Sequence, residues 1–216
     1  MADKYPDFDA LSRNETSGID FRILARRAKA SFAIVAPHGG GIEPGTSEVA
    51  DSIADAECCF YAFEGLKSSD NSDLHITSTH FDEPLCLKLI RQSQVVITIH
   101  GEESEANGEG VFLGGRNQAL GKNIGTALIA AGFGVRKHPD PDLQGTEAAN
   151  QCNRGKSRSG VQLELSRAVR KEMFLSLTRE GRKCTTAKFH TFVDVVHAVL
   201  HQAPNYESSS VQSSGN

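Results

Sequence analysis

Residues 31–41 read SFAIVAPHGGG, an apolar run that ends in proline, histidine and three glycines. The apolar part, residues 32–36, predicts a buried β-strand that stops where proline and glycine interrupt it. His38 is therefore expected just past the end of a strand. Residues 95–101, VVITIHG, repeat this pattern, with His100 after a second apolar strand.

Strand-like and helix-like segments alternate along the chain. Further strands are expected at residues 58–63, 74–78, 110–115, 134–138 and 160–166, and helices at 48–56 (N-cap Thr46 or Ser47), 81–93 (N-cap Asp82), 117–131 and 185–200. This alternation predicts an α/β fold with a central mixed, mostly parallel sheet flanked by helices on both faces. Residues 1–203 are expected to form one domain, and the polar tail 204–216 is expected to be disordered.

Length and composition exclude several classes of protein. The chain has 216 residues, enough for one sizeable domain, and contains no run of about 18 apolar residues that could span a membrane. Its polar, acidic start lacks the features of a secretory signal, which predicts a cytoplasmic protein. Five cysteines without a CxxC motif argue against a disulfide framework. The net charge of −4 gives no reason to expect nucleic-acid binding.

The charge is unevenly distributed. The stretch 154–171 contains six basic residues and a single acid, Glu164. It forms either an ordinary solvated face or a basic surface for anionic substrates. The polar, aperiodic segment 139–159 is long for a connection within a domain, and such loops are usually functional or disordered.

The two strand-end histidines suggest a metal site. Parallel strands of an open α/β sheet end at one crevice, so His38 and His100 are expected to lie side by side. Glu43 could join them because the glycines at 39–41 allow the loop to fold back. Two imidazoles and one carboxylate, with a fourth position open to water, are typical of catalytic zinc. A lone strand-end histidine is more often structural, and Glu48 is an alternative carboxylate, although its place in the first turn of a helix already explains it.

Such a site also needs a proton carrier. Glu164 is the candidate general base, with a solvent-facing position as the alternative. Arg154, in the long loop, could bind a substrate carboxylate or a developing oxyanion. Of the other histidines, His75 and His80 are expected to line a groove, whereas those at 190, 197 and 201 are expected to be structural or solvated.

Four segments together resemble a known family. VAPHGGGIEPGTSE, LHITSTHFDEPLC, VITIHG and CNRGKSRSGVQLELS resemble, in this order, the poly-γ-glutamate hydrolases of bacteriophages and Bacillus-type prophage elements. The resemblance covers residues 5–200, nearly the whole chain. It implies a fold akin to the zinc carboxypeptidases and an enzyme that cuts the γ-glutamyl amide bonds of poly-γ-glutamate.

The resemblance also implies site residues. Its motifs imply Zn²⁺ as the cofactor, held by His38, Glu43 and His100. They imply that Glu164 is the general acid/base that assists a zinc-activated water. Asn153 and Arg154 then resemble a carboxylate-binding pair, and the basic Lys156 and Arg158 beside them are further candidates for binding the acidic polymer.

Other functions remain as alternatives. A zinc amidase or peptidase acting on cell-wall peptides or other γ-glutamyl amides would use the same centre, and a non-catalytic polymer-binding protein is a third class. A serine esterase is excluded because HGGG is not accompanied by GxSxG. A phosphate-binding loop at NQCNRGKS is disfavoured because Asn150 replaces its first glycine. The protein is expected to be a monomer that reaches its polymer by cell lysis.

Overall fold

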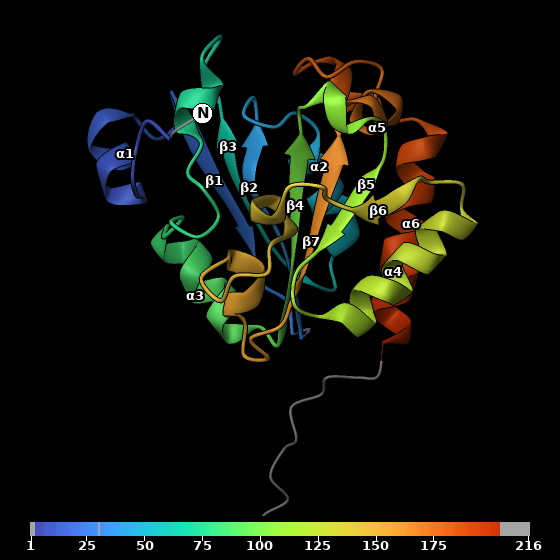
Figure 1. Cartoon of the computed structure of the whole chain (residues 1–216). Helices are drawn as coiled ribbons and strands as arrows, with labels where there is room; N and C mark the ends of the chain where they lie inside the picture. The colour runs from blue at the N-terminus through green and yellow to red at the C-terminus, as the bar shows by residue number, and fades with distance from the viewer. Residues whose placement is uncertain (1–2, 30, 204–216) are drawn as a thin grey trace, which may run out of the picture.

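The computed structural model describes residues 3–29 and 31–203, which contain a seven-stranded sheet. The strands are β1 (Phe21–Arg26), β2 (Phe32–Gly40), β3 (Cys59–Gly65), β4 (Val95–Glu102), β5 (Val111–Gly114), β6 (Val135–Lys137) and β7 (Val161–Ser166). Their order is β1-β3-β2-β4-β7-β5-β6 (Figure 1). The central four, β3-β2-β4-β7, are parallel. Antiparallel β1 and β5 flank them, and β6 runs parallel to β5.

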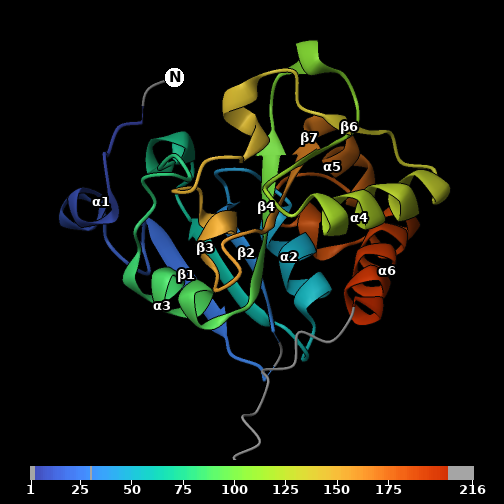
Figure 2. The ribbon, with the colours of Figure 1, turned by 60° about the horizontal axis from the view of Figure 1, so that its bottom comes forward.

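Helices cover both faces of this sheet. They are α1 (Phe8–Asn14), α2 (Thr46–Ala54), α3 (Pro84–Gln92), α4 (Gln118–Ala130), α5 (Arg167–Met173) and α6 (Ala187–Gln202). Helices α2, α4 and α6 pack on one face, and α1 and α3 on the other (Figure 2). The prediction of a single α/β domain with a mixed, mostly parallel sheet is therefore confirmed. No helix within the described part of the chain is long and apolar enough to cross a membrane.

Short 3₁₀ helices complete the connections. They are η1 (Asn71–Leu74), η2 (Glu105–Asn107), η3 (Pro141–Gln144), η4 (Gln151–Arg154) and η5 (Gly181–Lys183). Two of them, η3 and η4, lie in the long polar segment 139–159, which folds over the sheet instead of forming a structureless loop. The tail that was expected to be disordered, 204–216, lies outside the described residues.

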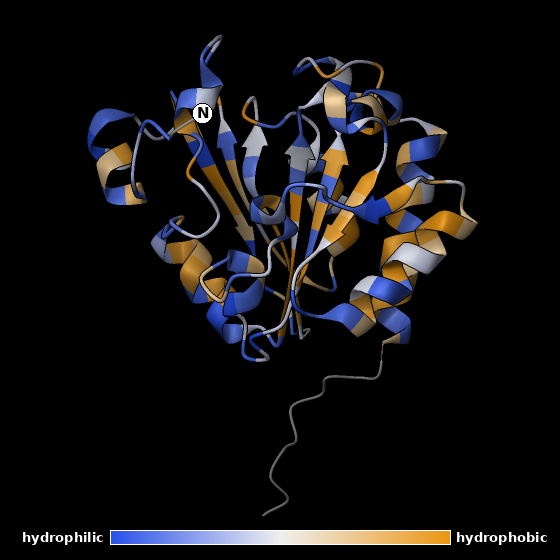
Figure 3. Cartoon of the chain, in the orientation of Figure 1, coloured by the Kyte–Doolittle hydropathy of each residue, from blue (hydrophilic) through white to orange (hydrophobic). Residues whose placement is uncertain are grey.

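The central strands are buried on both faces, which explains their continuous apolar sequences. In β4, Ile97 and Ile99 join the core beneath α2, α4 and α6, while Val96 joins the core beneath α1 and α3. Figure 3 shows the strands mostly orange, and paler or blue near the upper ends of β2 and β4. Those upper ends carry the histidines and glycines of the quoted segments.

Several element boundaries differ from the prediction. Strands β2 and β4 continue past His38 and His100, so both histidines lie inside the ends of strands. The predicted strand at 74–78 is absent, because the backbone N–H of Thr77 donates to Asp3 and the carbonyl of Ile76 accepts from His38. These side-chain bonds replace a strand ladder.

The cap of α3 also differs. Asp82 was the expected N-cap, but Glu83 caps the helix by accepting from the backbone N–H groups of Leu85 and Cys86. Asp82 instead accepts from the N–H of Phe8. For α2, Gly45 occupies the N-cap position instead of Thr46 or Ser47. Elements α1, β1 and α5 were not anticipated; β1 is half exposed and the helices have seven residues each, so their periodic signals are weak.

The packing of α6 yields a stability prediction. Phe192 is fully buried and its ring meets that of Phe133 edge-on at 5.4 Å. Replacing Phe192 with alanine should lower the free energy of unfolding by about 3–5 kcal/mol, because it leaves a cavity under the helix. The exposed Asp194 is the matched control, and Asp194→Ala should stay within about 0.5 kcal/mol of the parent. Urea denaturation measures both, and equal effects would contradict the assigned packing of α6.

Candidate metal centre

The parallel strands β2 and β4 bring His38 and His100 together. Val35 pairs with Thr98, so the two histidines that follow lie at the same level of neighbouring strands. Their Nδ1 atoms are 3.2 Å apart, and both residues are buried. The expected pairing of the strand-end histidines is therefore present in the fold.

An irregularity in β2 aims His38 at its partner. Strict alternation from Ile34 and Ala36, which face α2, would point His38 to that same face. The pairing of β2 with β3 shifts register between Ala36 and Gly39. Such a shift redirects the side chains that follow it, and the His38 ring lies 6.3 Å from the ring of Phe81 in the opposite core.

Glu43 completes the cluster through the glycine-containing loop. Its Oε1 lies 3.0 Å from Nδ1 of His38, and its Oε2 accepts the backbone N–H of Gly101 at 2.8 Å. Residue 101 must be glycine here, because a Cβ would come within 2.9 Å of Glu43 Cβ and 2.7 Å of Arg170 Cζ. Glu48 points elsewhere and accepts from Nε of Arg182 at 2.7 Å. The geometry thus favours Glu43 over Glu48 as the carboxylate of the centre.

The donor set fits a metal ion. Nε2 of His38 lies 2.9 Å from the carbonyl oxygen of Ile76, which can only accept, so Nε2 carries the proton and Nδ1 can offer a lone pair to a metal. Two nitrogens bound to one tetrahedral zinc at about 2.0–2.1 Å would be roughly 3.3 Å apart. The observed 3.2 Å between the two Nδ1 atoms is close to that value.

The electrostatics of the cluster also favour a cation. Burial raises the pKa of Glu43, but the neighbouring His38 and its hydrogen bond lower it by more, to about 2. Burial alone would lower the pKa of His38, yet the charge of Glu43 leaves it raised. Burial is also the main reason that the pKa of His100 falls to about 3. A buried carboxylate beside a neutral imidazole requires a positive charge, which either a proton on His38 or a metal ion supplies.

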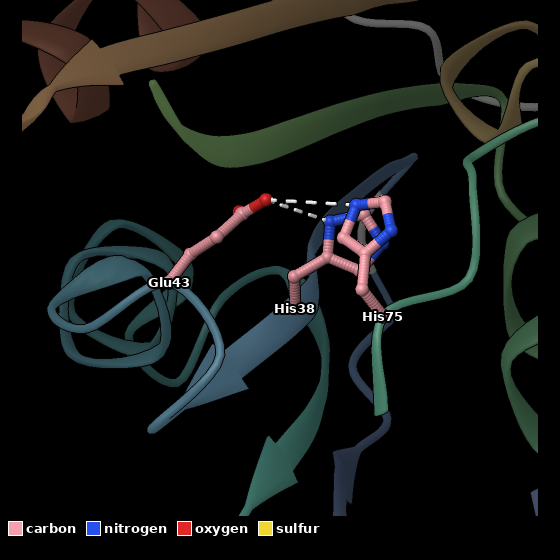
Figure 4. A group of neighbouring side chains, drawn as sticks. All are labelled: His38, Glu43 and His75. Carbon is pink, nitrogen blue, oxygen red and sulfur yellow. Dashed lines mark hydrogen bonds and ion pairs between the residues drawn. The ribbon is translucent and has the colours of Figure 1, made fainter. Parts of the chain in front are cut away.

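His75 is a fourth member of the cluster. Figure 4 shows its ring beside that of His38, with both facing Glu43, and the two ring centroids are 4.0 Å apart. The ligand atoms of His38, Glu43 and His75 lie within 4.8 Å of one another, which makes this trio a candidate metal group in its own right. Nδ1 of His75 bonds Oδ1 of Asp3 at 2.7 Å, so Nε2 is the atom turned toward Glu43, 4.0 Å away. The sequence had suggested only a groove-lining role for His75, and nothing in it pointed to Asp3, 72 residues away.

Glu164 lies beside the cluster on β7. It pairs with His100 across the parallel strands β4 and β7, so their side chains share one face of the sheet. It is buried, and its Oε1 accepts from Nε2 of Gln162 at 2.9 Å. Burial, reinforced by the charges of Glu43 and Glu102, raises the pKa of Glu164 well above its usual range. A raised pKa suits a carboxyl group that takes up and releases a proton during a reaction. Because Glu164 is buried, the solvent-facing alternative is wrong.

Arg170 is a structural residue of the centre. The basic stretch had suggested a surface role, but Arg170 is fully buried. Its guanidinium donates to the carbonyl oxygens of Pro44, Leu165 and Glu102. This one side chain therefore ties α5 to the residue that follows Glu43 and to the end of β4. Arg170 belongs neither to a solvated face nor to a basic surface, the two alternatives that the sequence left open for this stretch.

The predicted substrate residues are scattered. The Asn153 amide donates to the carbonyls of Gly145 and Glu147, which leaves it no donor for a substrate, and Arg154 donates to the carbonyl of Phe81. Lys156 and Arg158 lie farther away. The N–H of Lys156 bonds the carbonyl of Ser93, which precedes β4 and lies roughly 20 Å along the strand from His100. Lys156 and Arg158 therefore do not lie beside the centre but in the turn before β7, at the end of the sheet where the parallel strands begin. Their role in binding the polymer stays a prediction.

Two histidines and a carboxylate at the carboxyl ends of the strands of a mostly parallel α/β sheet form a candidate metal centre of the kind that metal-dependent hydrolases use. The chain belongs to the poly-gamma-glutamate hydrolase family, whose model matches residues 5–195. This confirms the resemblance seen in the sequence. The likeness to zinc carboxypeptidases stays a prediction.

Individual proteins show the same relationship. The SPbeta prophage-derived UPF0714 protein YoqZ of Bacillus subtilis (strain 168) is 37% identical over 203 residues, covering 93% of this chain and 73% of YoqZ. The structure of a bacteriophage poly-gamma-glutamate hydrolase matches with a TM-score of 0.87 and 32% identity, covering 92% of this chain and 96% of the other. The zinc-free apo form of YndL matches with a TM-score of 0.87 and 34% identity, covering 93% and 98%.

The assignment of the carboxylate can be tested with a matched pair of variants. Glu43→Gln removes the charged carboxylate of the candidate metal centre and should weaken zinc binding there by at least about 10–100-fold. A loss of that size follows even when only a residue that supports a ligand is removed. Glu48→Gln, five residues away, should bind zinc as the parent does, because Glu48 pairs with Arg182. Zinc titration followed by dialysis and elemental analysis measures both. A loss of zinc in the Glu48 variant alone would reverse the assignment.

The bond between Asp3 and His75 gives a second test. Asp3→Ala removes the partner that orients the His75 ring, so polymer cleavage should fall by about 10–100-fold. Asp9→Ala is the control, since the contact that it breaks is an exposed ion pair with Arg13 on α1. The two variants are compared with the parent by their initial rates of polymer cleavage, at equal concentrations of folded protein. Full activity of the Asp3 variant would show that His75 needs no orientation by this carboxylate.

Proposed function

We propose that this protein is a zinc-dependent hydrolase that cuts the γ-glutamyl amide bonds of poly-γ-glutamate. The observation that carries the proposal is the convergence of His38, Glu43 and His100 at the carboxyl edge of the sheet, with Glu164 on the adjacent strand. Zinc would be held by Nδ1 of each histidine and by the Glu43 carboxylate, and when bound it would supply a water whose pKa is lowered to about 7. Since these residues all come from one chain, we propose that a monomer suffices for activity.

The protein's own groups carry the proton through the reaction. Glu164 accepts a proton from the attacking water and passes it to the leaving amine nitrogen. Gln162 holds one Glu164 oxygen and so fixes the direction of the carboxyl group. His75 has its Nδ1 bonded to Asp3 and its Nε2 turned toward Glu43, so its ring can help to orient the substrate beside the centre. The reaction forms no covalent bond between enzyme and substrate.

An acidic polymer also suits a second feature of the surface. A cavity of about 410 Å³ lies between α4 and the strands β5 and β6. Its lining contains Lys122, Arg136 and Lys137 and no acidic residue. Each unit of a γ-linked glutamate chain keeps a free carboxylate, so units remote from the scissile bond could pair with these cations.

The direct test combines metal analysis with the viscosity of a poly-γ-glutamate solution. The zinc-loaded protein should lower the viscosity, and a chelator should abolish the effect, because the hydrolysis depends on the metal. Rapid loss of viscosity indicates internal cleavage. Release of terminal glutamate with little viscosity loss indicates cleavage from an end. Zinc binding without viscosity loss or glutamate release would show that poly-γ-glutamate is not the substrate. The γ-glutamyl amides of cell-wall peptides would then be assayed in its place.

The role of Glu164 predicts a separation of metal binding from turnover. Glu164→Gln should keep zinc at the parent level but lower turnover by at least about 100-fold, because the amide cannot take up the proton. His38→Gln should lose both the zinc of this centre and the activity, since Nδ1 is a proposed ligand. Zinc content and initial rates on poly-γ-glutamate measure the two effects separately. If Glu164→Gln remained fully active, another group would have to be the proton acceptor.

A further inference from the structure

A second cluster of ligand-type side chains lies far from the centre already described. It consists of Glu57, in the connection between α2 and β3, and His197 and His201, one turn apart on α6. Glu57 precedes β3, so it lies at the edge where the parallel strands begin, opposite the edge that carries His38. Figure 1 agrees: the end of α6 lies at the bottom of the view, and the arrowheads of β2 and β4 point to the top.

The three side chains converge on a small space. Nε2 of His201 is 2.6 Å from a carboxylate oxygen of Glu57 and 3.0 Å from Nε2 of His197. The i, i+4 spacing on a helix places both imidazoles on one face. A hydrogen bond between the two rings requires that one Nε2 lacks a proton, so at least one lone pair already points into the cluster. The Glu57 backbone is fixed at the end of α2, where its N–H bonds the carbonyl of Ala54.

We propose that Glu57, His197 and His201 form a second metal site, which takes a divalent transition ion such as Zn²⁺. Imidazole nitrogens favour zinc and its neighbours, whereas Ca²⁺ and Mg²⁺ require oxygen ligands. Two histidines and one carboxylate leave one position of a tetrahedral zinc for water. For His197 and His201 this proposal goes beyond the sequence-based expectation that they are structural or solvated.

The ion at this site would act as a clamp between distant segments. It joins the last turn of α6 to the connection that leads into β3, about 140 residues earlier in the chain. The side chains of Glu57 and His201 are about half exposed, so the site exchanges metal freely with solvent and is weaker than the buried centre. Because the ion binds only the folded arrangement, it should raise the melting temperature as zinc is added.

Equilibrium dialysis of the full-length protein against zinc tests the proposal. The parent should bind two equivalents, and His197→Gln, His201→Gln and Glu57→Gln should each bind one within the same concentration range. Losing a direct ligand should lower the zinc affinity of the second site by more than about tenfold. Losing only a residue that supports a ligand already lowers metal affinity by about 10–100-fold. His190→Gln is the matched control on the same helix, because the His190 side chain is exposed and bonds the hydroxyl of Thr185, away from the cluster. This variant should still bind two equivalents.

Two further results separate this site from the hydrolytic centre. The His38→Gln variant should still bind one equivalent of zinc. The double variant that combines His38→Gln with His201→Gln should bind none. The α6 variants should cleave poly-γ-glutamate at the parent rate, since none of these side chains touches the centre. If His197→Gln, His201→Gln and Glu57→Gln each bound as many equivalents as the parent, the proposal would be overturned whatever the polymer assay shows.

Discussion

A buried carboxylate facing two buried imidazoles is the constraint around which this protein is organised. Burying the Glu43 carboxylate without a compensating positive charge would destabilise the fold by far more than the packing of one side chain stabilises it. The surrounding residues compensate for this burial: the N–H of Gly101 bonds one carboxylate oxygen, and His38 faces the other. A proton or a metal ion must then lie between the carboxylate and the rings. The burial of Glu43 therefore favours a cation at the carboxyl ends of these strands.

The sheet makes that arrangement rigid. Parallel neighbours β2, β4 and β7 deliver His38, His100 and Glu164 to one edge, and a register shift within β2 aims the first of these. Buried Arg170 then holds the residue after Glu43 and the end of β4 through carbonyl oxygens, so that helix α5 stabilises the loop. Positions set by strands and by a bonded guanidinium vary less than positions on a free loop, which is what a hydrolytic centre needs.

Acidic groups, cations and imidazoles gather in separate parts of the molecule. Acidic side chains gather around Glu164, where the charges of Glu43 and Glu102 raise its pKa, and Glu102 in turn bonds Nε2 of the buried His138. Cations line the cavity beside α4, and imidazoles form the proposed clamp on α6. A protein with a net charge of −4 can therefore act on an acidic polymer, because local fields and not the overall charge decide where the polymer binds.

The sequence by itself determined the α/β class, most strands and helices, the pairing of His38 with His100, and the family. Periodicity and strand-end histidines are local signals, and the order of strands at a parallel edge follows from general topology. Only the tertiary structure showed how the loop brings Glu43 to the histidines while Glu48 pairs with Arg182. It alone showed that Asp3 reaches His75 and that Lys156 and Arg158 lie near the opposite ends of the strands. Those facts depend on a register shift, on contacts between residues more than 70 positions apart, and on where a loop crosses the sheet. Local propensity contains none of this information, because such contacts arise only when the whole chain packs.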